Sequence, residues 1–537
     1  RRDYKMLGYD FRATASWNHV FNDIHITNFF AGTEINSTDR SKNYYQGWGM
    51  QYSMGEIPYY VYEFFKKGIE DGNNYYSLSQ TRSRSAAFFA NATYSYKGRY
   101  TVNGTARYEG TNRMGKSRSA RWLPTWNVSG AWNAHEEKFF SNLTSVLSHF
   151  TLKASYSLTA DRGPADVTNS QAIITSYSPY RPFTSIQESG LYIKELENSE
   201  LTYEKKHELN IGADMGFLNN RINLAVDWYK RNNYDLIGIV NTQGAGGQIL
   251  KYANIASMKS HGIEFTLSTK NIKTKDFNWN TDFIFSNAKN EVTDLKQNAN
   301  VMELISGNGF AKQGYPVRGL FSIPFVGLDK DGIPVIINEK GEATSTDINF
   351  QERQNTGFLK YEGPTDPTIT GSLGNMFSYK GFRLNLFITY SFGNVIRLNP
   401  VFKAYYSDLT AMTREFKNRW TLPGDEAKTN VPAILSKRMY DSNEDLKYAY
   451  NAYNYSTERI AKGDFIRLKE ISLAYDFPKA WINPLKLTDL SLKVQATNLF
   501  LIYADDKLNG QDPEFFNAGG VASPVPRQFT ITLRLGL

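Results

Sequence analysis

The feature that most constrains the fold is a two-residue alternation of apolar and polar side chains, which recurs along the whole chain. Residues 151–158 read Thr-Leu-Lys-Ala-Ser-Tyr-Ser-Leu, and residues 529–537 read Phe-Thr-Ile-Thr-Leu-Arg-Leu-Gly-Leu. A period of two indicates a β-strand whose two faces meet different surroundings. Each run lasts about ten residues, the length that a tilted strand needs to cross a bilayer.

Reading this alternation along the chain predicts fifteen strands. They are expected at residues 9–17, 24–33, 86–96, 100–108, 122–132, 150–158, 207–216, 221–230, 259–267, 277–287, 370–378, 381–391, 465–477, 488–498 and 527–537.

The connections between these strands alternate in length. Short ones, such as Lys97-Gly98-Arg99, take every other place. The 133–149 connection is the longest of the short class and has room for a helical turn. Long connections fill the remaining places, at 34–85, 109–121, 159–206, 231–258, 288–369, 392–464 and 499–526.

This rhythm of connections indicates an outer-membrane barrel. A water-soluble sandwich has no reason to keep its long loops at one end, whereas such a barrel has short periplasmic turns and long extracellular loops. The first strand must then run toward the periplasm. Fifteen strands would leave an unpaired edge, which cannot lie in lipid, so we expect further strands upstream of Arg1. The predicted fold class is all-β, a transmembrane antiparallel β-barrel.

The composition agrees with a barrel and excludes other classes. The chain has 35 Tyr, 34 Phe and 9 Trp but no Cys, which excludes disulfide scaffolds and thiolate metal sites. Its mean hydropathy of −0.48 is compatible with strands that are apolar on only one face. The 61 basic and 53 acidic residues are scattered along the chain, which gives no indication of nucleic-acid binding.

One segment matches a catalytic pattern, the P-loop spelling Gly110-Thr-Asn-Arg-Met-Gly115-Lys116-Ser117. A chance match in a chain of this length arises about once in fifty sequences. A real P-loop follows a buried strand and opens a helix. Here the preceding strand is polar on one face, and residues 118–124 do not look like the start of a helix. We therefore predict that this segment binds no nucleotide.

Other chemical motifs are also weak. The segment Asp329-Lys-Asp331-Gly332 resembles the opening of a calcium loop, but no glutamate follows at the required position, and a tight turn is the better interpretation. The six histidines are dispersed without ligand spacing, and no Gly-x-Ser-x-Gly elbow is present. The sequence predicts no catalytic, cofactor-binding or metal-binding residue, and so no enzyme.

Aromatic residues crowd the first long connection. One interpretation is a loop packed on its own side chains, or an interfacial girdle. The other is a contact surface for a partner protein or a substrate, since flat amphipathic rings suit both. The candidate contact residues are Tyr44, Tyr45, Trp48, Tyr52, Tyr59, Tyr60 and Tyr62.

Several segments together resemble the SusC/RagA-like TonB-dependent outer-membrane transporters, in family order and over nearly the whole chain. Four positions depart from the family pattern, namely Glu109, Met114, Tyr203 and the terminal Leu537. The segments that carry the resemblance are 99–110, 122–126, 130–132, 137–139, 152–156, 198–205, 210–214, 220–222, 254–258, 262–264, 419–425, 463–469, 473–478, 498–500, 512–514 and 526–527.

The resemblance implies a barrel of about 22 strands in the full protein, of which residues 1–537 would be roughly the last fifteen. A plug and other N-terminal domains would lie upstream, and the TonB complex would act through them. The implied function is active import of a large nutrient, an oligosaccharide first or a peptide second, across the outer membrane of a Gram-negative bacterium. The implied partner is a SusD-like surface lipoprotein, and no cofactor is implied. The alternatives are a passive porin and, from another class, a secreted β-rich adhesin.

Overall fold

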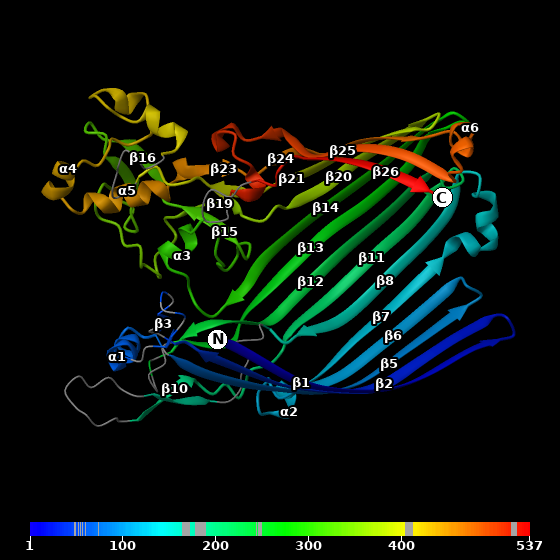
Figure 1. Cartoon of the computed structure of the whole chain (residues 1–537), viewed down its shortest axis with the longest axis horizontal. Coiled ribbons are helices and arrows are strands. Elements are labelled where there is room, and N and C mark those ends of the chain that lie inside the picture. Colours follow the sequence, from blue (N-terminus) through cyan, green and yellow to red (C-terminus); the bar gives the residue numbers. More distant parts are fainter. Residues whose placement is uncertain are drawn as a thin grey trace. The chain divides into compact units, whose positions relative to one another are not determined.

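The computed structural model describes most of the chain as long antiparallel strands with structured connections (Figure 1). None of the helices in the described ranges has the length and apolarity of a membrane-spanning helix. The described residues are 1–47, 50–51, 53, 55, 57–58, 61–73, 75–163, 172–177, 189–242, 244, 250–402, 412–516 and 524–537.

All fifteen predicted strands are confirmed, and they form one sheet in which neighbours follow chain order. These strands are β1 (Arg2–Phe21), β2 (His25–Tyr45), β5 (Tyr76–Tyr96), β6 (Tyr100–Thr111), β7 (Trp122–Asn133), β8 (Leu147–Asp161), β11 (Glu204–Phe217), β12 (Ile222–Asn241), β13 (Leu250–Lys273), β14 (Phe277–Leu295), β20 (Ile369–Tyr379), β21 (Phe382–Phe392), β24 (Phe465–Asp476), β25 (Asp489–Ala504) and β26 (Gln528–Gly536).

The chain divides into two compact units. The first comprises Arg1–Trp132, Ser155–Leu209 and Asn233–Ala256. In it β1, β2, β5, β6 and β7 pair in unbroken antiparallel register. Its smaller elements are β3 (Met50–Gln51), β4 (Ile57–Pro58), α1 (Tyr62–Glu70), α2 (Arg118–Arg121), β9 (Ile173–Tyr177) and β10 (Gly190–Glu195).

The backbone conformation of the hairpin turns in the first unit explains which residue types occupy them. Asn22 and Asp23 have φ of 51° and 56°, and Lys97 and Gly98 have φ of 53° and 69°. Two consecutive left-handed residues match the right-handed twist of the flanking strands, and Asn, Asp and Gly adopt this conformation at low cost. The short connections are therefore tight turns, as predicted.

The second unit comprises Asn133–Ala154, Asn210–Asn232 and Ser257–Leu537. Two 3₁₀ turns, η2 (Ala134–Glu136) and η3 (Lys138–Asn142), occupy the connection where room for a helical turn was noted. Its other elements are α3 (Val301–Ile305), β15 (Gly319–Ser322), β16 (Phe325–Leu328), β17 (Pro334–Ile337), β18 (Ala343–Thr344), β19 (Lys360–Pro364), β22 (Val395–Arg397), η5 (Arg414–Asn418), η6 (Asp425–Ala427), α4 (Lys437–Ser442), α5 (Leu446–Asn454), η7 (Thr457–Arg459), β23 (Ile460–Lys462), α6 (Lys479–Ile482), η8 (Asn483–Leu485), η9 (Asp506–Leu508) and η10 (Pro513–Phe515).

Several predicted strand ends on the long-connection side were wrong, because these strands run well past ten residues, whereas others, such as the starts of β7 and β24, lie where they were predicted. The 34–85 connection is the clearest correction: β2 continues to Tyr45 and β5 begins at Tyr76. The 231–258 connection shortens in the same way, since β12 ends at Asn241 and β13 begins at Leu250. The added part of β2 is polar on both faces, since residues 36–43 read Asn-Ser-Thr-Asp-Arg-Ser-Lys-Asn. A strand that extends beyond lipid meets water on both faces and needs no alternation.

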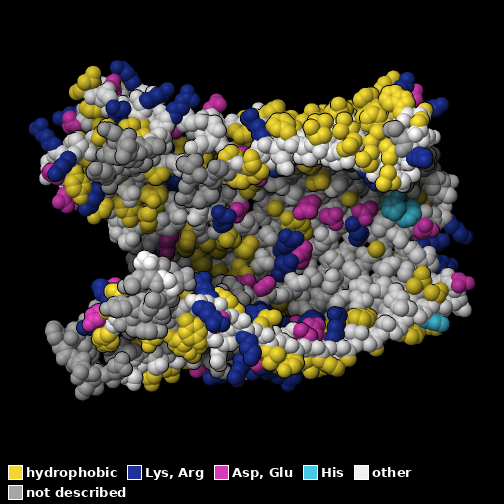
Figure 2. Space-filling model, viewed as in Figure 1, with side chains coloured by type: hydrophobic (Ala, Val, Ile, Leu, Met, Phe, Trp, Pro, Cys, Tyr) yellow, Lys and Arg dark blue, Asp and Glu magenta, His cyan; other side chains and the backbone are white. Residues whose placement is uncertain are grey.

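Within the second unit the strand register separates an apolar face from a polar one. Leu473, Val494 and Ile531 lie in one cross-strand row, and their side chains are exposed. Figure 2 shows apolar side chains gathered over β25 and β26. On the opposite face, Ser472 pairs with Gln495 in the adjacent row. This is the alternation that the sequence predicts for a barrel wall.

Candidate functional site

The long connections of the second unit fold around a buried core of their own. Val301, Ile305, Phe321 and Ile323 have at most 1% of their surface exposed and pack in one cluster. Helix α3 supplies two of these side chains, and it is fixed at its start by a capping box. In that box the Asn300 side chain accepts a hydrogen bond from the Glu303 amide, while the Glu303 carboxylate accepts one from the Asn300 amide. We call this packed region, residues 296–368 with 393–402 and 412–464, the platform.

A buried arginine joins the two connections that make the platform. Arg397, at the end of β22, is 7% exposed. Its guanidinium donates to the carbonyls of Ile305, Phe321 and Ser456 at 3.3, 2.6 and 2.9 Å, and to the Ser322 hydroxyl at 3.1 Å. Burial lowers the pKa of Arg397 to about 9, so the side chain remains charged at neutral pH. One cation thus satisfies acceptors from three separate segments, which fixes the platform as a unit.

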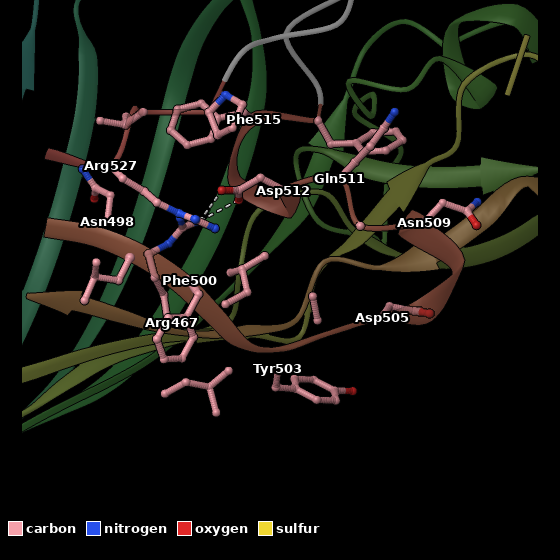
Figure 3. Close-up of a pocket in the computed structure, with 18 of the residues that line it drawn as sticks. Arg467, Asn498, Phe500, Tyr503, Asp505, Asn509, Gln511, Asp512, Phe515 and Arg527 are labelled. Carbon is pink, nitrogen blue, oxygen red and sulfur yellow. Dashed lines mark hydrogen bonds and ion pairs between the residues drawn. The ribbon is translucent and has the colours of Figure 1, made fainter. Parts of the chain in front are cut away.

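Beside the platform lies a cavity of about 900 Å³, lined by the end of β25 and by the segment that follows it (Figure 3). The Nη2 atom of Arg467, from β24, donates to both carboxylate oxygens of Asp512, at 2.6 and 2.7 Å. The same nitrogen lies 3.2 Å from a carboxylate oxygen of Glu514. The Arg467 and Asp512 side chains are only 6% and 9% exposed. Because this charge-assisted pair is shielded from water, it anchors the 505–516 segment to the sheet.

A bulge in β25 shapes the same cavity. Glu470 pairs with Thr497, whereas Leu468 pairs with Phe500, so residues 498 and 499 stand opposite one residue of β24. Asn498 takes up the bend in the left-handed region, with φ of 54°. Bulges bend the strand that carries them and redirect its side chains. This bend lies within residues 498–500, one of the segments that carry the family resemblance.

The cavity wall mixes aromatic and polar side chains. Phe500, Tyr503 and Phe515 contribute rings, while Asn509 and Gln511 contribute amides. Rings can stack on the faces of sugars or side chains, and amides can bind hydroxyls or peptide groups. Such a surface can hold an extended polar ligand. This surface lies in the second unit, and it was not predicted as a site from the sequence. Four of the segments that carry the family resemblance nevertheless meet there, namely 463–469, 498–500, 512–514 and 526–527.

The structure separates the aromatic residues that were predicted as contacts. Tyr44 and Tyr45 lie at the end of β2 and not in a loop, and the Tyr45 ring stands 4.9 Å from that of Tyr76, edge to face. Tyr62 begins α1, and 75% of its side chain is exposed. Trp48, Tyr52, Tyr59 and Tyr60 lie outside the described residues.

The segment with the P-loop spelling, residues 110–117, does not form the phosphate-binding loop of a nucleotide site. The amides of Gly115 and Lys116 donate to the carbonyls of Leu201 and Ser199, and the Lys116 ammonium pairs with Glu197 at 2.6 Å. One expectation was wrong, because a helix does begin at Arg118, capped by the Ser117 hydroxyl. That helix, α2, has only four residues, and the amides of Gly115 and Lys116 before it already have carbonyl partners.

The Asp-Gly segment is a tight turn between β16 and β17, as predicted. The Gly332 amide donates to the Asp329 carbonyl, and the Asp329 carboxylate accepts from the amides of Asp331 and Ile333. That carboxylate therefore serves the turn. Across the described ranges, no three His, Asp or Glu side chains gather as a metal site would require.

Comparison with known proteins decides the family. The model of the TonB-dependent receptor-like β-barrel matches residues 2–499. The chain belongs to this family. Members of the family are embedded in the outer membrane of Gram-negative bacteria, so the apolar rows of the barrel face lipid. The sheet of fifteen antiparallel strands is thus wall from a transmembrane β-barrel, which confirms the predicted fold class.

Two relatives and one solved structure define the type of barrel. A TonB-dependent receptor of Formosa agariphila is 26% identical over 583 residues, covering 97% of this chain and 52% of the relative. The TonB-dependent receptor SusC of Bacteroides thetaiotaomicron is also 26% identical, covering 88% of this chain and 47% of the relative. The RagAB peptide transporter superposes with a TM-score of 0.76 at 21% identity, covering 99% of this chain and 56% of that one. The predicted SusC/RagA-like type is confirmed, and the chain spans about half the length of these proteins.

Proposed function

We propose that the complete protein imports a large nutrient across the outer membrane, driven by the TonB complex. The observation that carries this proposal is the platform, with its own buried core, on a barrel wall of a transporter and receptor family. A passive pore needs only a mouth, whereas an importer needs a structured surface that holds its cargo. We further propose that a plug and other N-terminal domains lie upstream and receive the TonB complex.

The uptake experiment separates active import from a porin. Cells that produce the full protein would receive labelled oligosaccharides or labelled peptides, with and without an ionophore that collapses the proton gradient. We expect uptake to stop while surface binding persists. Unchanged uptake after collapse would favour the porin. Recovery of cleaved or modified cargo from purified protein would contradict the proposal that the protein is not an enzyme.

The substrate class is tested in the same assay. We propose an oligosaccharide first and a peptide second, because the cavity offers both ring faces and amides. The RagAB neighbour is a peptide transporter, which supports the second class. Each labelled compound should compete with its own class. Replacing Tyr503 and Phe515 by alanine should weaken binding of the true class, whereas Trp481→Ala on α6, outside the cavity lining, should not.

We propose that a SusD-like surface lipoprotein contacts the region between β2 and β5. The candidate contacts are the aromatic residues predicted there, and the described part of this region includes α1, where Tyr62 and Phe64 are 75% and 50% exposed. Aromatic side chains are enriched at the centres of protein interfaces. Tyr62→Ala combined with Phe64→Ala should reduce co-purification of a lipoprotein in mild detergent, while Trp481→Ala should not. A transporter purified without any stoichiometric surface partner would refute this proposal.

A further inference from the structure

A second cavity, of about 440 Å³, lies in the first unit where β5, β6 and β7 meet α2. Three aromatic side chains form one wall of it, Phe88, Tyr108 and Trp122. Three cations form the other, Lys116, Arg118 and Arg121. The import mechanism proposed above uses none of these residues. The cavity also includes the lysine of the P-loop spelling, for which the nucleotide interpretation gave no role.

The register places the aromatic wall on the lipid face of the barrel. Phe88 pairs directly with Tyr108, and the neighbouring row pairs Gly110 with Trp122. Phe88 is 57% exposed, and the same alternate positions lower in these strands carry Val102 and other apolar residues. The intervening positions of β6 carry only polar side chains. Because an apolar, exposed face of this barrel contacts lipid, the cavity opens toward the membrane.

The stacked rings of Tyr108 and Trp122 mark the end of the apolar band that lies toward the long connections. The Tyr108 and Trp122 rings stack at 5.1 Å, and the Trp122 ring covers Gly110 so closely that a Cβ there would lie 2.4 Å from it. Tyrosine and tryptophan concentrate where hydrocarbon meets headgroups. Tyr100, at the other end of β6, follows the short turn, and about eight residues at roughly 3.3 Å each separate it from Tyr108 along the strand. The two aromatic levels thus bracket a lipid-crossing stretch of this wall.

The cations stand beyond that aromatic level, on the side of the long connections. Lys116 is paired with Glu197, but among the described residues Arg118 has no acidic partner, and its side chain is exposed. The Nε atom of Arg121 is buried without a hydrogen-bond partner in the described structure. Arg82 precedes Phe88 by six residues in β5, an even spacing that places both side chains on the same face of the strand. In Figure 2 basic side chains gather at the lower edge, at the position of α2 in Figure 1.

We propose that this cavity binds the phosphate-bearing headgroup of a lipid in the outer leaflet. Its acyl chains would lie along Phe88 and the apolar band below it, and its phosphate would meet Arg118 and Arg121. Guanidinium groups bind phosphate through paired, charge-assisted hydrogen bonds. Basic pockets at the surface of a membrane bind anionic lipid headgroups by the same chemistry. The arrangement of rings below and arginines above fits a lipid better than a soluble anion, which has no use for the apolar wall.

The test uses the full transporter purified in mild detergent, with monophosphoryl lipid A as the probe and native mass spectrometry to measure retained lipid. We expect the parent protein to retain the lipid and to retain little of its dephosphorylated form. Arg118→Gln combined with Arg121→Gln should weaken retention roughly thirtyfold, about fivefold for each cation. The matched control, Lys437→Gln with Arg438→Gln on α4, removes two exposed cations outside this cavity and should retain the lipid as the parent does.

Three outcomes would overturn the proposal. They are equal retention by the parent and the arginine variant, equal retention of phosphorylated and dephosphorylated lipid, and displacement of the lipid by inorganic phosphate. The last would show a site for a free anion. If the double variant fails to fold, the single variant Arg118→Gln replaces it, because this exposed side chain has no acidic partner in the described structure. It should still weaken retention about fivefold.

Discussion

A charge placed on alternate residues of β25 should distinguish the two faces of the barrel wall. Val494 and Gln495 are consecutive residues of one strand, and both lie between paired neighbours. Val494 stands between Leu473 and Ile531, whereas Gln495 stands between Ser472 and Thr530. The substitutions Val494→Arg and Gln495→Arg therefore add the same charge one residue apart on a strand that is paired on both sides, but on opposite faces of the wall.

The magnitude follows from the depth of Val494 in the membrane. It lies five residues from Asp489, where β25 begins, and at about 3.3 Å per residue with a tilt near 40° this places it roughly 13 Å above that end. This is about half of an apolar band that is typically about 25 Å tall. An arginine facing lipid at the midplane costs about 2–4 kcal/mol, which lowers the ratio of folded to unfolded protein by about thirtyfold to several hundredfold. On the polar face the same arginine should cost less than about 1 kcal/mol.

The assay is folding of the full transporter into lipid vesicles from urea, with the folded fraction read from the mobility shift of unheated protein in gel electrophoresis. Val494→Arg should shift the urea midpoint strongly, and Gln495→Arg should leave it near that of the parent. Equal tolerance of the two substitutions would refute the assignment of faces. A larger loss for Gln495→Arg would reverse that assignment.

Three further substitutions test the connections. Asp512→Asn removes the shielded charged partner of Arg467 and should destabilise the packing of the 505–516 segment against the sheet by about 3 kcal/mol. Hydrogen exchange in this segment should then be faster, with exchange in the barrel unchanged. Equally slow exchange in the variant would show that the pair is not an anchor. Arg397→Met removes the guanidinium donor from three buried carbonyls, of which that of Ser456 still accepts from the Arg459 amide. Each buried carbonyl left without a donor costs about 1–3 kcal/mol, so limited proteolysis should cut the platform sooner than in the parent. Equal resistance would contradict the proposal that the guanidinium joins the two connections. Calorimetry should detect no ATP binding to the parent protein, and Lys116→Ala should leave that result unchanged. ATP binding by the parent that disappears in the variant would restore the P-loop interpretation.

The sequence was sufficient for the barrel wall because lipid imposes a rule on every second residue. That rule placed all fifteen strands and their order. It could not find the upper ends of β2 and β5, since Asn36 to Asn43 face water on both sides and carry no alternation. Helical and strand propensities are similar for such polar stretches, and only pairing with a neighbour decides their structure.

The site was harder to predict because its residues are distant in sequence. Arg467 and Asp512 are 45 residues apart, and Arg397 bonds carbonyls from 59 to 92 residues away. No local pattern identifies an arginine that will be buried against carbonyls, since the acceptors are backbone atoms common to every residue. The resemblance marked the segments that meet at the cavity, but it could not state that they meet. Conversely, the aromatic crowd that drew attention in the sequence divides between the strand β2, the helix α1 and residues outside the described ranges.

The platform's separate core also bears on how such a protein can change over generations. Its packing depends on residues such as Val301 and Phe321, while the wall depends on cross-strand rows such as Leu473 with Val494. A residue on the outer surface of the platform, such as Val326 with 57% of its side chain exposed, belongs to neither set. Selection can therefore act on the exposed surface of the platform residue by residue without disturbing insertion into the membrane. Substitutions on the platform surface and substitutions in the wall are therefore constrained by separate sets of contacts within a single chain.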